Sequence, residues 1–293
     1  MRIKKLNKNF SAASETYLDY SQIQNESAIL LLEEIKRSKF VGGSPKNILD
    51  IGCGPGNYTN LLAEYFDKSM IFAFDISDAM VNIAKKNNQN PRIKYFTADG
   101  ENLGWSENYA KIVPCHPKLV SGSKIKMLKQ VQNDSLVMKI ESEKFDLITS
   151  NATIQWFENI EKPLEIYKQM LTENGCIIFS VFGPKTFCEL GESVSDLNQK
   201  ISAFQFRSKD EYAAVLREKF GCDKFKITEK FITKDYQNLM SLLRSIKNTG
   251  TQGNNNNKIW TKNMIDELDQ IYSQKFGKIV ATYHLIFCEM RQK

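Results

Sequence analysis

Three glycines stand at alternate positions in ILDIGCGPGNY (48–58), directly after a short apolar run. Gly52, Gly54 and Gly56 would let the chain turn sharply between a strand and a helix, and they would let a ligand approach backbone where a Cβ atom would clash. The helix that follows adds unpaired N–H groups in its first turn. The segment therefore predicts a ligand-binding loop in which Gly52, Cys53, Gly54 and Gly56 border the ligand. We expect Cys53 to fill space there as a small residue and not to take part in thiol chemistry.

The acidic residue that opens this loop indicates which ligand it takes. Dinucleotide-binding loops have the spacing G-x-G-x-x-G and place a pyrophosphate at the helix N-terminus. Here the spacing is G-x-G-x-G and the loop opens at Asp50. Its carboxylate would repel a pyrophosphate and attract the amino group of a methionine moiety. The loop therefore favours S-adenosylmethionine over NAD.

Two further acidic residues end the next two predicted strands. Asp75 follows an apolar run about twenty residues after the glycines, where a carboxylate can accept the hydroxyls of a ribose. Asp99 ends the following strand, where it can accept the amino group of an adenine. The predicted cofactor site is completed by neighbouring positions, which are Ile76, Gly100 and Asn151. The alternative is that both acids only cap the turns that follow them.

Apolar runs typical of buried strands alternate with amphipathic segments typical of helices. The predicted strands are 46–51, 70–75, 92–96, 145–151, 175–182, 223–236 and 280–290, and the predicted helices are 10–37, 57–65, 78–86, 160–171, 186–201, 209–220 and 238–247. This alternation predicts an α/β fold of the Rossmann-like kind, a doubly wound, mostly parallel sheet with helices on both faces.

The length of 293 residues fits a single domain, 1–293, with two special segments. More than forty residues separate Asp99 from the strand at Phe145, where a connection of about 2–6 is usual. Its central part resembles translated palindromic repeats of bacterial genomes, so we expect 107–143 to be an inserted surface loop without a catalytic role. The alternative is a functional binding loop. We expect 186–250, which interrupts the alternation, to form a helical lid over the site.

The composition is that of an ordinary soluble protein, and the net charge of +6 suits an acidic partner or reflects a lysine-rich background. Six cysteines form no C-x-x-C pair and the chain has only two histidines, so we expect no metal. Scattered cysteines and a basic N-terminus without an apolar run predict a cytoplasmic protein. The longest apolar run, 176–182, is too short to span a bilayer. We expect neither a membrane nor a nucleic acid as partner.

Five segments together resemble a known family. They are NFSAASETYLDYSQIQ (9–24), LDIGCGPG (49–56), SNATIQWFENI (150–160), FGPKTFCEL (182–190) and TYHL (282–285). The chain is similar to the malonyl-(acyl-carrier protein) O-methyltransferases of biotin synthesis, within the class I S-adenosylmethionine-dependent methyltransferases. LDIGCGPG alone indicates only the class, whereas SNATIQW followed by FGPKTFCEL is much more specific. The resemblance covers nearly the whole chain outside 107–143.

The resemblance implies methyl transfer from S-adenosylmethionine to the free carboxylate of a malonyl thioester on acyl carrier protein, with S-adenosylhomocysteine as product. It also implies seven strands, the last antiparallel, and an N-terminal helix that folds over the cofactor with Tyr17 near the reacting groups. The chain departs from the family at one position. Family members often carry a basic residue before the phenylalanine that matches Phe206, whereas this chain has Gln205 there and Arg207 one place beyond.

Further substrate-binding residues are predicted from position and type. Gln155 and Trp156 follow the end of the fourth strand, and we expect them to form part of the wall of the methyl-transfer site. An aromatic face there suits a sulfonium cation. Arg244 and Lys247 share a helix face and could hold the malonyl carboxylate or the phosphopantetheine phosphate. A solvated face is the alternative. Tyr283, in the TYHL segment, completes the set.

The expected mechanism needs no general base, because a malonyl carboxylate is already ionised near neutral pH. Catalysis would come from positioning and from the exclusion of water. We interpret His284 as structural rather than catalytic. Three alternatives remain open: a methyltransferase for another small carboxylic acid, a non-methylating assembly factor or hydroxylase that binds the cofactor, and an enzyme disabled by its insertion.

Overall fold

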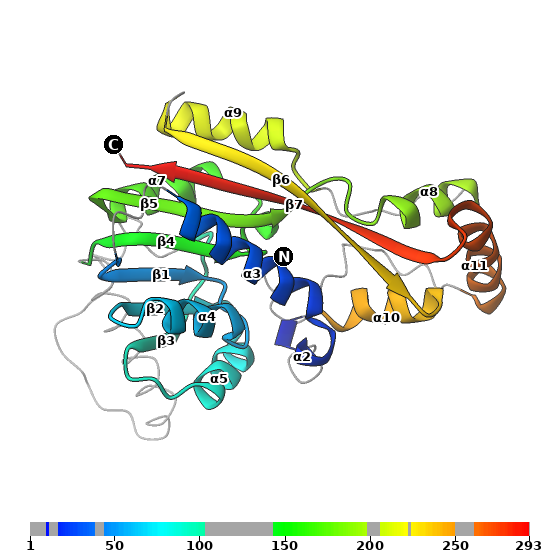
Figure 1. Ribbon diagram of the computed structural model, residues 1–293, viewed down its shortest axis with the longest axis horizontal. Helices are drawn as coiled ribbons and strands as arrows, with labels where there is room; N and C mark the ends of the chain where they lie inside the picture. The colour runs from blue at the N-terminus through cyan, green and yellow to red at the C-terminus, as the bar shows by residue number, and fades with distance from the viewer. Residues whose placement is uncertain are drawn as a thin grey trace, which may run out of the picture.

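The computed structural model describes residues 10–11, 17–38, 44–102, 143–197, 206–221, 224–249 and 261–292. In this part of the chain one seven-stranded sheet has the order β3-β2-β1-β4-β5-β7-β6 (Figure 1). Its strands are β1 (Asn47–Ile51), β2 (Met70–Asp75), β3 (Ile93–Thr97), β4 (Phe145–Asn151), β5 (Leu171–Phe182), β6 (Phe225–Tyr236) and β7 (Ile279–Arg291). β7 is antiparallel to both its neighbours, and every other neighbouring pair is parallel. The predicted α/β fold with an antiparallel last strand is confirmed.

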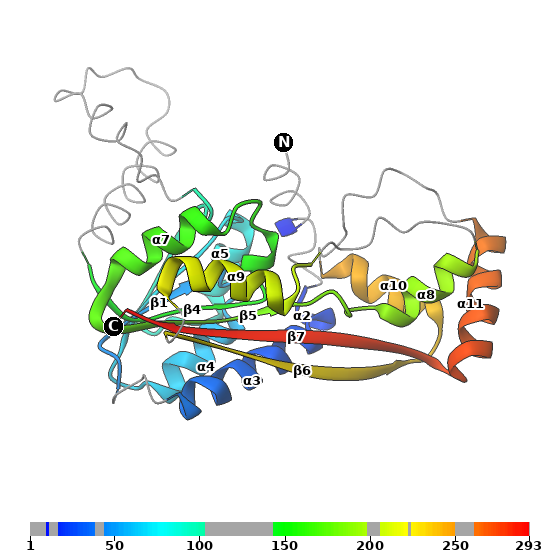
Figure 2. The same cartoon turned by 90° about the horizontal axis from the view of Figure 1, so that it is seen from above.

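The helices cover both faces of the sheet, as predicted. They are α2 (Tyr17–Tyr20), α3 (Gln22–Arg37), α4 (Asn57–Tyr65), α5 (Asp78–Asn87), the 3-10 turn η2 (Ile154–Trp156), α7 (Glu161–Met170), α8 (Cys188–Asp196), α9 (Lys209–Phe220), α10 (Leu239–Asn248) and α11 (Lys262–Phe276). One core joins α3, α4, α5, α8, α10 and α11 to the sheet, and a second core joins α7 and α9 to its other face. Figure 2 shows α7 and α9 on the opposite side of the strands from α3 and α4.

The strands differ in burial according to their place in the sheet. β1 and β2 are buried along almost their whole length, because helices cover both of their faces. Such strands have continuous apolar runs. β6 lies at the edge and its exposed residues alternate with partly buried ones, which explains the alternating sequence that predicted it. The position of each strand in the sheet is therefore visible in its sequence pattern.

β6 and β7 form an arm that extends past the rest of the sheet (Figures 1 and 2). The β5–β7 ladder ends at the pair Phe182 and Leu285, whereas β6 and β7 stay paired as far as Tyr236 and Ile279. Helices α8, α10 and α11 pack on this arm, and α8 contacts α11. The sequence analysis did not predict α11.

Several predicted boundaries are corrected by the structure. The helix predicted over 10–37 is interrupted at Ser21, where α2 gives way to α3. The helix predicted from 186 begins only at Cys188, because the preceding residues form a turn held on β7 by two backbone hydrogen bonds, Gly183 N to His284 O and Phe187 N to Thr282 O, both 2.8 Å.

The two special segments of the sequence differ in how much of them the structure describes. The expected insertion, 107–143, lies outside the described residues, apart from residue 143. The segment expected as a lid, 186–250, contains α8, α9, β6 and α10. Of these, β6 belongs to the main sheet and α9 packs on it, while α8 and α10 pack on the arm. A lid function of α10 stays a prediction.

Candidate active site

A pocket of about 1090 Å³, open to solvent at its mouth, lies at the carboxyl ends of β1, β2, β3 and β4. We call it the cofactor pocket. β1 stands between β2 and β4, so the strand order reverses at this point, which is where open α/β sheets bind ligands. Ten residues predicted for cofactor or substrate line the cofactor pocket: Tyr17, Gly52, Cys53, Gly54, Asp75, Ile76, Asp99, Gly100, Asn151 and Trp156.

The glycine loop follows β1 closely, and two of its glycines are required by their surroundings. Gly52 has a φ of +72°, and a Cβ atom there would lie 2.2 Å from the side chain of Thr153. Gly56 has a φ of +92° as the N-cap of α4, and a Cβ there would lie 3.0 Å from the Tyr95 hydroxyl. Gly56 does not line the cofactor pocket. Its role is to shape the turn into the helix.

Asp75 joins the end of β2 to the glycine loop. Its Oδ2 accepts the Gly54 N–H at 3.0 Å and its Oδ1 accepts the Ser77 N–H at 2.9 Å. Burial raises the pKa of the Asp75 carboxyl, and these backbone N–H groups oppose that shift. The carboxylate is thus fixed at the pocket wall with its orientation set by backbone.

Asp99 caps a turn and also lines the cofactor pocket, so its capping role leaves the predicted contact with a ligand open. Oδ1 accepts the backbone N–H groups of Glu101 at 3.0 Å and Asn102 at 3.3 Å. The Asn102 side chain donates to Oδ2 at 3.1 Å. Next to it, the Tyr167 hydroxyl donates to the Gly100 carbonyl at 2.5 Å and fixes the loop after β3.

Asp50 lies beneath the glycine loop and does not line the cofactor pocket. Its Oδ2 accepts the Thr59 hydroxyl at 2.6 Å, while its Oδ1 is buried without a hydrogen-bond partner among the described residues. Burial raises the pKa of Asp50 to about 7; the Thr59 hydroxyl opposes the shift and the Asp75 charge adds to it. A cation bound near Asp50 would favour its ionised form.

Asn151 connects the end of β4 to the N-terminal helix. Its Oδ1 accepts the hydroxyls of Ser27, at 2.8 Å, and Ser180, at 2.7 Å, and its Nδ2 donates to the Gln24 carbonyl at 2.9 Å. These bonds hold α3 at the carboxyl end of the sheet. The next residue, Ala152, has a φ of +52° and also lines the pocket, so the chain is locally strained at this wall.

The predicted substrate residues near the cofactor pocket divide into two groups. Tyr17 and Trp156 line it, and the ring of Phe10 lies 6.0 Å from the ring of Trp156. Burial raises the pKa of the Tyr17 hydroxyl, and the charge of Asp75 adds to the shift. Gln155 points away: it is buried and its Oε1 accepts the Phe182 N–H at 3.0 Å. Gln155 therefore supports the wall and does not form it.

A second pocket, of about 370 Å³, adjoins the cofactor pocket and shares Gln24 with it. It contains Tyr283, another predicted substrate residue, and its lining comprises Tyr20, Ile23, Gln24, Phe182, Thr186, Phe187, Phe206, Ser245, Ile246, Thr249 and Tyr283. Arg244 and Lys247 are exposed on α10 and line neither pocket.

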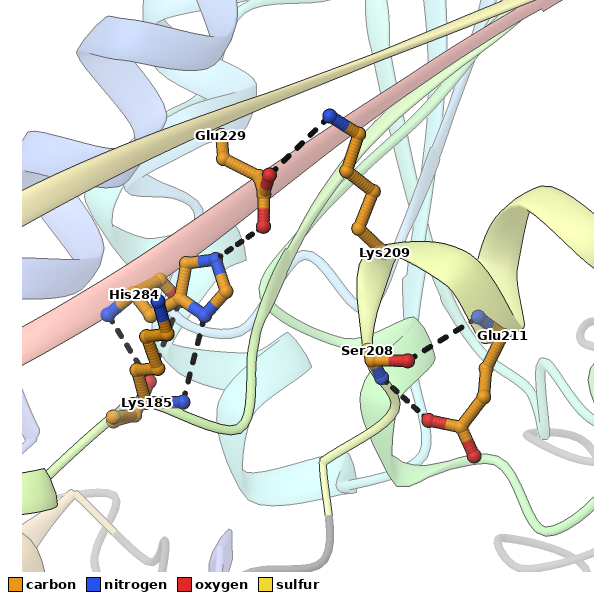
Figure 3. A network of polar contacts seen from close by, with 7 residues as sticks. Lys185, Ser208, Lys209, Glu211, Glu229 and His284 are labelled. Atoms are coloured by element: carbon orange, nitrogen blue, oxygen red, sulfur yellow. Dashed lines mark hydrogen bonds and ion pairs between the residues drawn. The ribbon is translucent and has the colours of Figure 1, made fainter.

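His284 lies away from both linings and holds the turn that follows β5 (Figure 3). The ring is 2% exposed and stacks on Phe231 with centroids 4.6 Å apart. The Lys185 N–H donates to Nδ1 at 3.5 Å, so the neutral ring carries its proton on Nε2, which donates to Glu229 at 3.0 Å. Burial lowers the pKa of His284. This geometry agrees with its interpretation as a structural residue.

The region where the sequence departs from the family is partly described. Gln205 lies outside the described residues. Arg207 donates to the backbone carbonyls of Phe157 at 3.2 Å and Glu158 at 2.8 Å. Both of these residues line the cofactor pocket, so Arg207 fastens the segment before α9 to the pocket rim.

The charges of the cofactor pocket are of one sign. Asp75, Asp99, Glu101 and Glu158 line it, and its described lining contains no lysine, arginine or histidine. The pocket therefore presents an anionic wall suited to a cationic ligand.

Across the described residues no group of three His, Cys, Asp or Glu side chains could hold a metal ion. In the same part of the chain, none of the helices is long and apolar enough to cross a membrane.

Some residues of the site were missed by the sequence analysis. Gln24 and Asn25 come from α3, and Thr153 and Glu158 from the segment after β4. The last two lie within SNATIQWFENI, whose resemblance marked the segment without identifying each residue. Gln24 ends NFSAASETYLDYSQIQ, whose resemblance likewise marked only the segment, and Asn25 carried no signal, because only the packing of α3 brings both residues to the sheet.

The glycine loop, the strand-end acids and the mixed sheet define a methyltransferase. A family model described as "Methyltransferase domain" matches residues 24–224. A crystal structure of a Bacillus halodurans protein has the same fold, with a TM-score of 0.55 at 13% identity over 89% of this chain and 98% of that one.

Curated relatives identify the group more narrowly. A protein of Ilyobacter polytropus named malonyl-(acyl-carrier protein) O-methyltransferase 1 is 34% identical over 97% of this chain and 92% of its own length. One of Bacillus cereus, named malonyl-(acyl-carrier protein) O-methyltransferase, is 26% identical over 98% of this chain and 97% of its own. The chain belongs to the malonyl-(acyl-carrier protein) O-methyltransferase family.

Proposed function

We propose that this enzyme binds S-adenosylmethionine in the cofactor pocket and transfers its methyl group to the free carboxylate of a malonyl group carried on acyl carrier protein. The observation that carries the proposal is the convergence of the glycine loop, Asp75, Asp99 and Asn151 on one pocket at a reversal of strand order. The names of the relatives supply the acceptor.

The residues of the pocket fit this cofactor. Asp75 and Asp99 line the pocket and would accept hydroxyl and amino groups of an adenosine, and the glycine loop would allow a ligand to approach backbone closely. The buried, unpartnered Oδ1 of Asp50 adds negative potential beneath the loop. When bound, S-adenosylmethionine supplies a methyl group on a sulfonium cation, and an anionic wall favours that charge.

The acceptor would need no proton removed, because its carboxylate is ionised near neutral pH. The pocket lining matches this requirement, since its described part offers no histidine or lysine as a base. Phe10, Tyr17 and Trp156 would exclude water and orient the acceptor. The four acids of the pocket repel a carboxylate, so acceptor binding would depend on the positive charge of the cofactor.

Acyl carrier protein is an acidic partner, and the net charge of +6 would steer its approach. Arg244 and Lys247 are exposed on α10, so a role in carrier binding suits them better than contact with the malonyl group. Steering weakens as salt screens the charges. We also propose that the enzyme works in the cytoplasm, without a metal and without nucleic-acid or membrane partners.

The test is transfer of labelled methyl from S-adenosylmethionine to malonyl acyl carrier protein, with acetyl carrier protein and free malonate as controls. Label on the malonyl carrier alone is the expected result. Label on free acids as well would identify a methyltransferase of small carboxylic acids. An enzyme that binds the cofactor and labels nothing would match the assembly-factor or hydroxylase alternative, or a chain disabled by its insertion.

A further inference from the structure

The second pocket adjoins the cofactor pocket and is lined by residues of α3, β5, β7 and α10. Gln24 on α3 belongs to the linings of both pockets, so the two spaces meet at this residue. The far wall is built from Phe182 at the end of β5, Tyr283 on β7 and Ser245 on α10. The second pocket is therefore the adjoining space that a linear substrate would enter if its end lay in the cofactor pocket.

A row of aromatic rings connects the two spaces. Trp156 of the cofactor pocket lies 6.0 Å from Phe206, and Phe206 lies 6.1 Å from Phe182. Phe182 in turn lies 6.1 Å from Tyr283. Rings at these separations pack against one another and form a continuous apolar wall. Such a wall favours alkyl and thioether groups and excludes water from them.

The chemistry of the second pocket differs from that of the cofactor pocket. Eleven residues of the described part of the chain line it, and none of these carries a charged side chain. Burial of a carboxylate there would leave the charge uncompensated, which is costly. The charged end of the acceptor must therefore remain beside the cofactor, and only an uncharged part can enter the second pocket.

Hydroxyl groups supply the polar part of this pocket. The Tyr283 and Tyr236 hydroxyls are 2.5 Å apart, and the Tyr236 hydroxyl donates to Ser245 at 3.5 Å. Burial raises the pKa of Tyr283, so its hydroxyl stays protonated. Hydroxyls donate and accept, so this group can pair with a carbonyl oxygen or with an amide N–H.

We infer that the second pocket binds the thioester carbonyl and the adjoining amide-bearing thiol arm of the acyl substrate, and that this contact selects a thioester over a free acid. This inference rests on the proposed function. It makes Tyr283 and Ser245 substrate-binding residues and explains why a pocket whose described lining has polar hydroxyls but no charged side chain adjoins an anionic one. Thioesters of carrier protein and of coenzyme A share the arm, so both are probes.

The experiment measures binding without turnover. The full-length enzyme is saturated with sinefungin, an analogue in which an amine replaces the sulfonium, and is titrated calorimetrically with malonyl carrier protein and with malonyl coenzyme A. The variant Ile246→Trp fills the second pocket from α10. Met240→Trp is the matched control, because Met240 lies on the same helix, is 38% exposed and lines neither pocket. Tyr283→Phe removes one hydroxyl and keeps the ring.

Ile246→Trp is expected to raise the Kd of both thioesters at least tenfold, Tyr283→Phe to raise it about fivefold, and Met240→Trp to leave it within twofold. Sinefungin affinity should stay within twofold throughout, which shows that each variant is folded. Unchanged thioester binding by Ile246→Trp, or a loss confined to the carrier protein, would overturn the inference. Absence of methyl transfer to malonyl carrier protein by the wild-type enzyme would instead refute the proposed function.

Discussion

Replacement of Asp50 by Asn tests the electrostatics beneath the glycine loop. The two side chains have the same shape, and the Asn oxygen can still accept the Thr59 hydroxyl that Asp50 accepts at 2.6 Å. What changes is the charge on an oxygen that is buried without a partner among the described residues. The variant therefore removes the cost of ionising a buried carboxyl and little else.

The size of the effect follows from the pKa. Burial raises the pKa of Asp50 from 3.8 to about 7 in the folded protein. A shift of about three units, at about 1.4 kcal/mol each, sets an upper limit of about 4 kcal/mol. Between those two pKa values the folded state binds the proton and the unfolded state does not, so the Asp50 carboxyl by itself destabilises the folded state increasingly as the pH rises from 4 to 7.

The assay is urea unfolding of the ligand-free wild type and Asp50→Asn at several pH values from 4 to 8. The advantage of the variant should grow from pH 4 to pH 7, by up to about 4 kcal/mol, and level off above it. The same variant should bind S-adenosylhomocysteine more weakly at pH 8, because it lacks the negative charge that attracts the amino group. A variant no more stable than the wild type at pH 8 would refute the reasoning.

Three further predictions concern the loop, the histidine and the insertion. Gly52→Ala should lower the free energy of unfolding by about 1–3 kcal/mol and weaken sinefungin binding at least tenfold, because the new Cβ would meet Thr153 at 2.2 Å with φ at +72°; calorimetry that finds wild-type affinity would contradict this. The folded pKa of His284 is lowered, so this histidine by itself should destabilise the folded state increasingly as the pH falls below about 6.5, and the stability of His284→Asn relative to the wild type should rise over that range in urea unfolding; parallel pH profiles would speak against it. Replacement of 107–143 by a short Gly-Ser linker should leave sinefungin affinity within twofold, and a larger loss would show that the segment serves binding.

The sequence predicted the parts of the site that lie at strand ends. Asp75 and Asp99 each end an apolar run, and the carboxyl ends of parallel strands meet at one edge of a sheet. The glycine loop followed from residue type and spacing alone. The strand pattern likewise predicted all seven strands, and the family resemblance implied that the last one is antiparallel. The sequence analysis missed α11 and predicted one continuous first helix, which the structure interrupts at Ser21.

The sequence alone could not determine which side chains converge from distant segments. Gln24 reaches both pockets only because α3 is held on the sheet through Asn151. Arg244 and Lys247 share a helix face with suitable spacing, yet the packing of α10 directs that face to solvent. Local spacing fixes which residues share a strand end or a helix face. The direction in which that face points depends on helix packing and on the length of the β6–β7 arm, which only the tertiary structure decides.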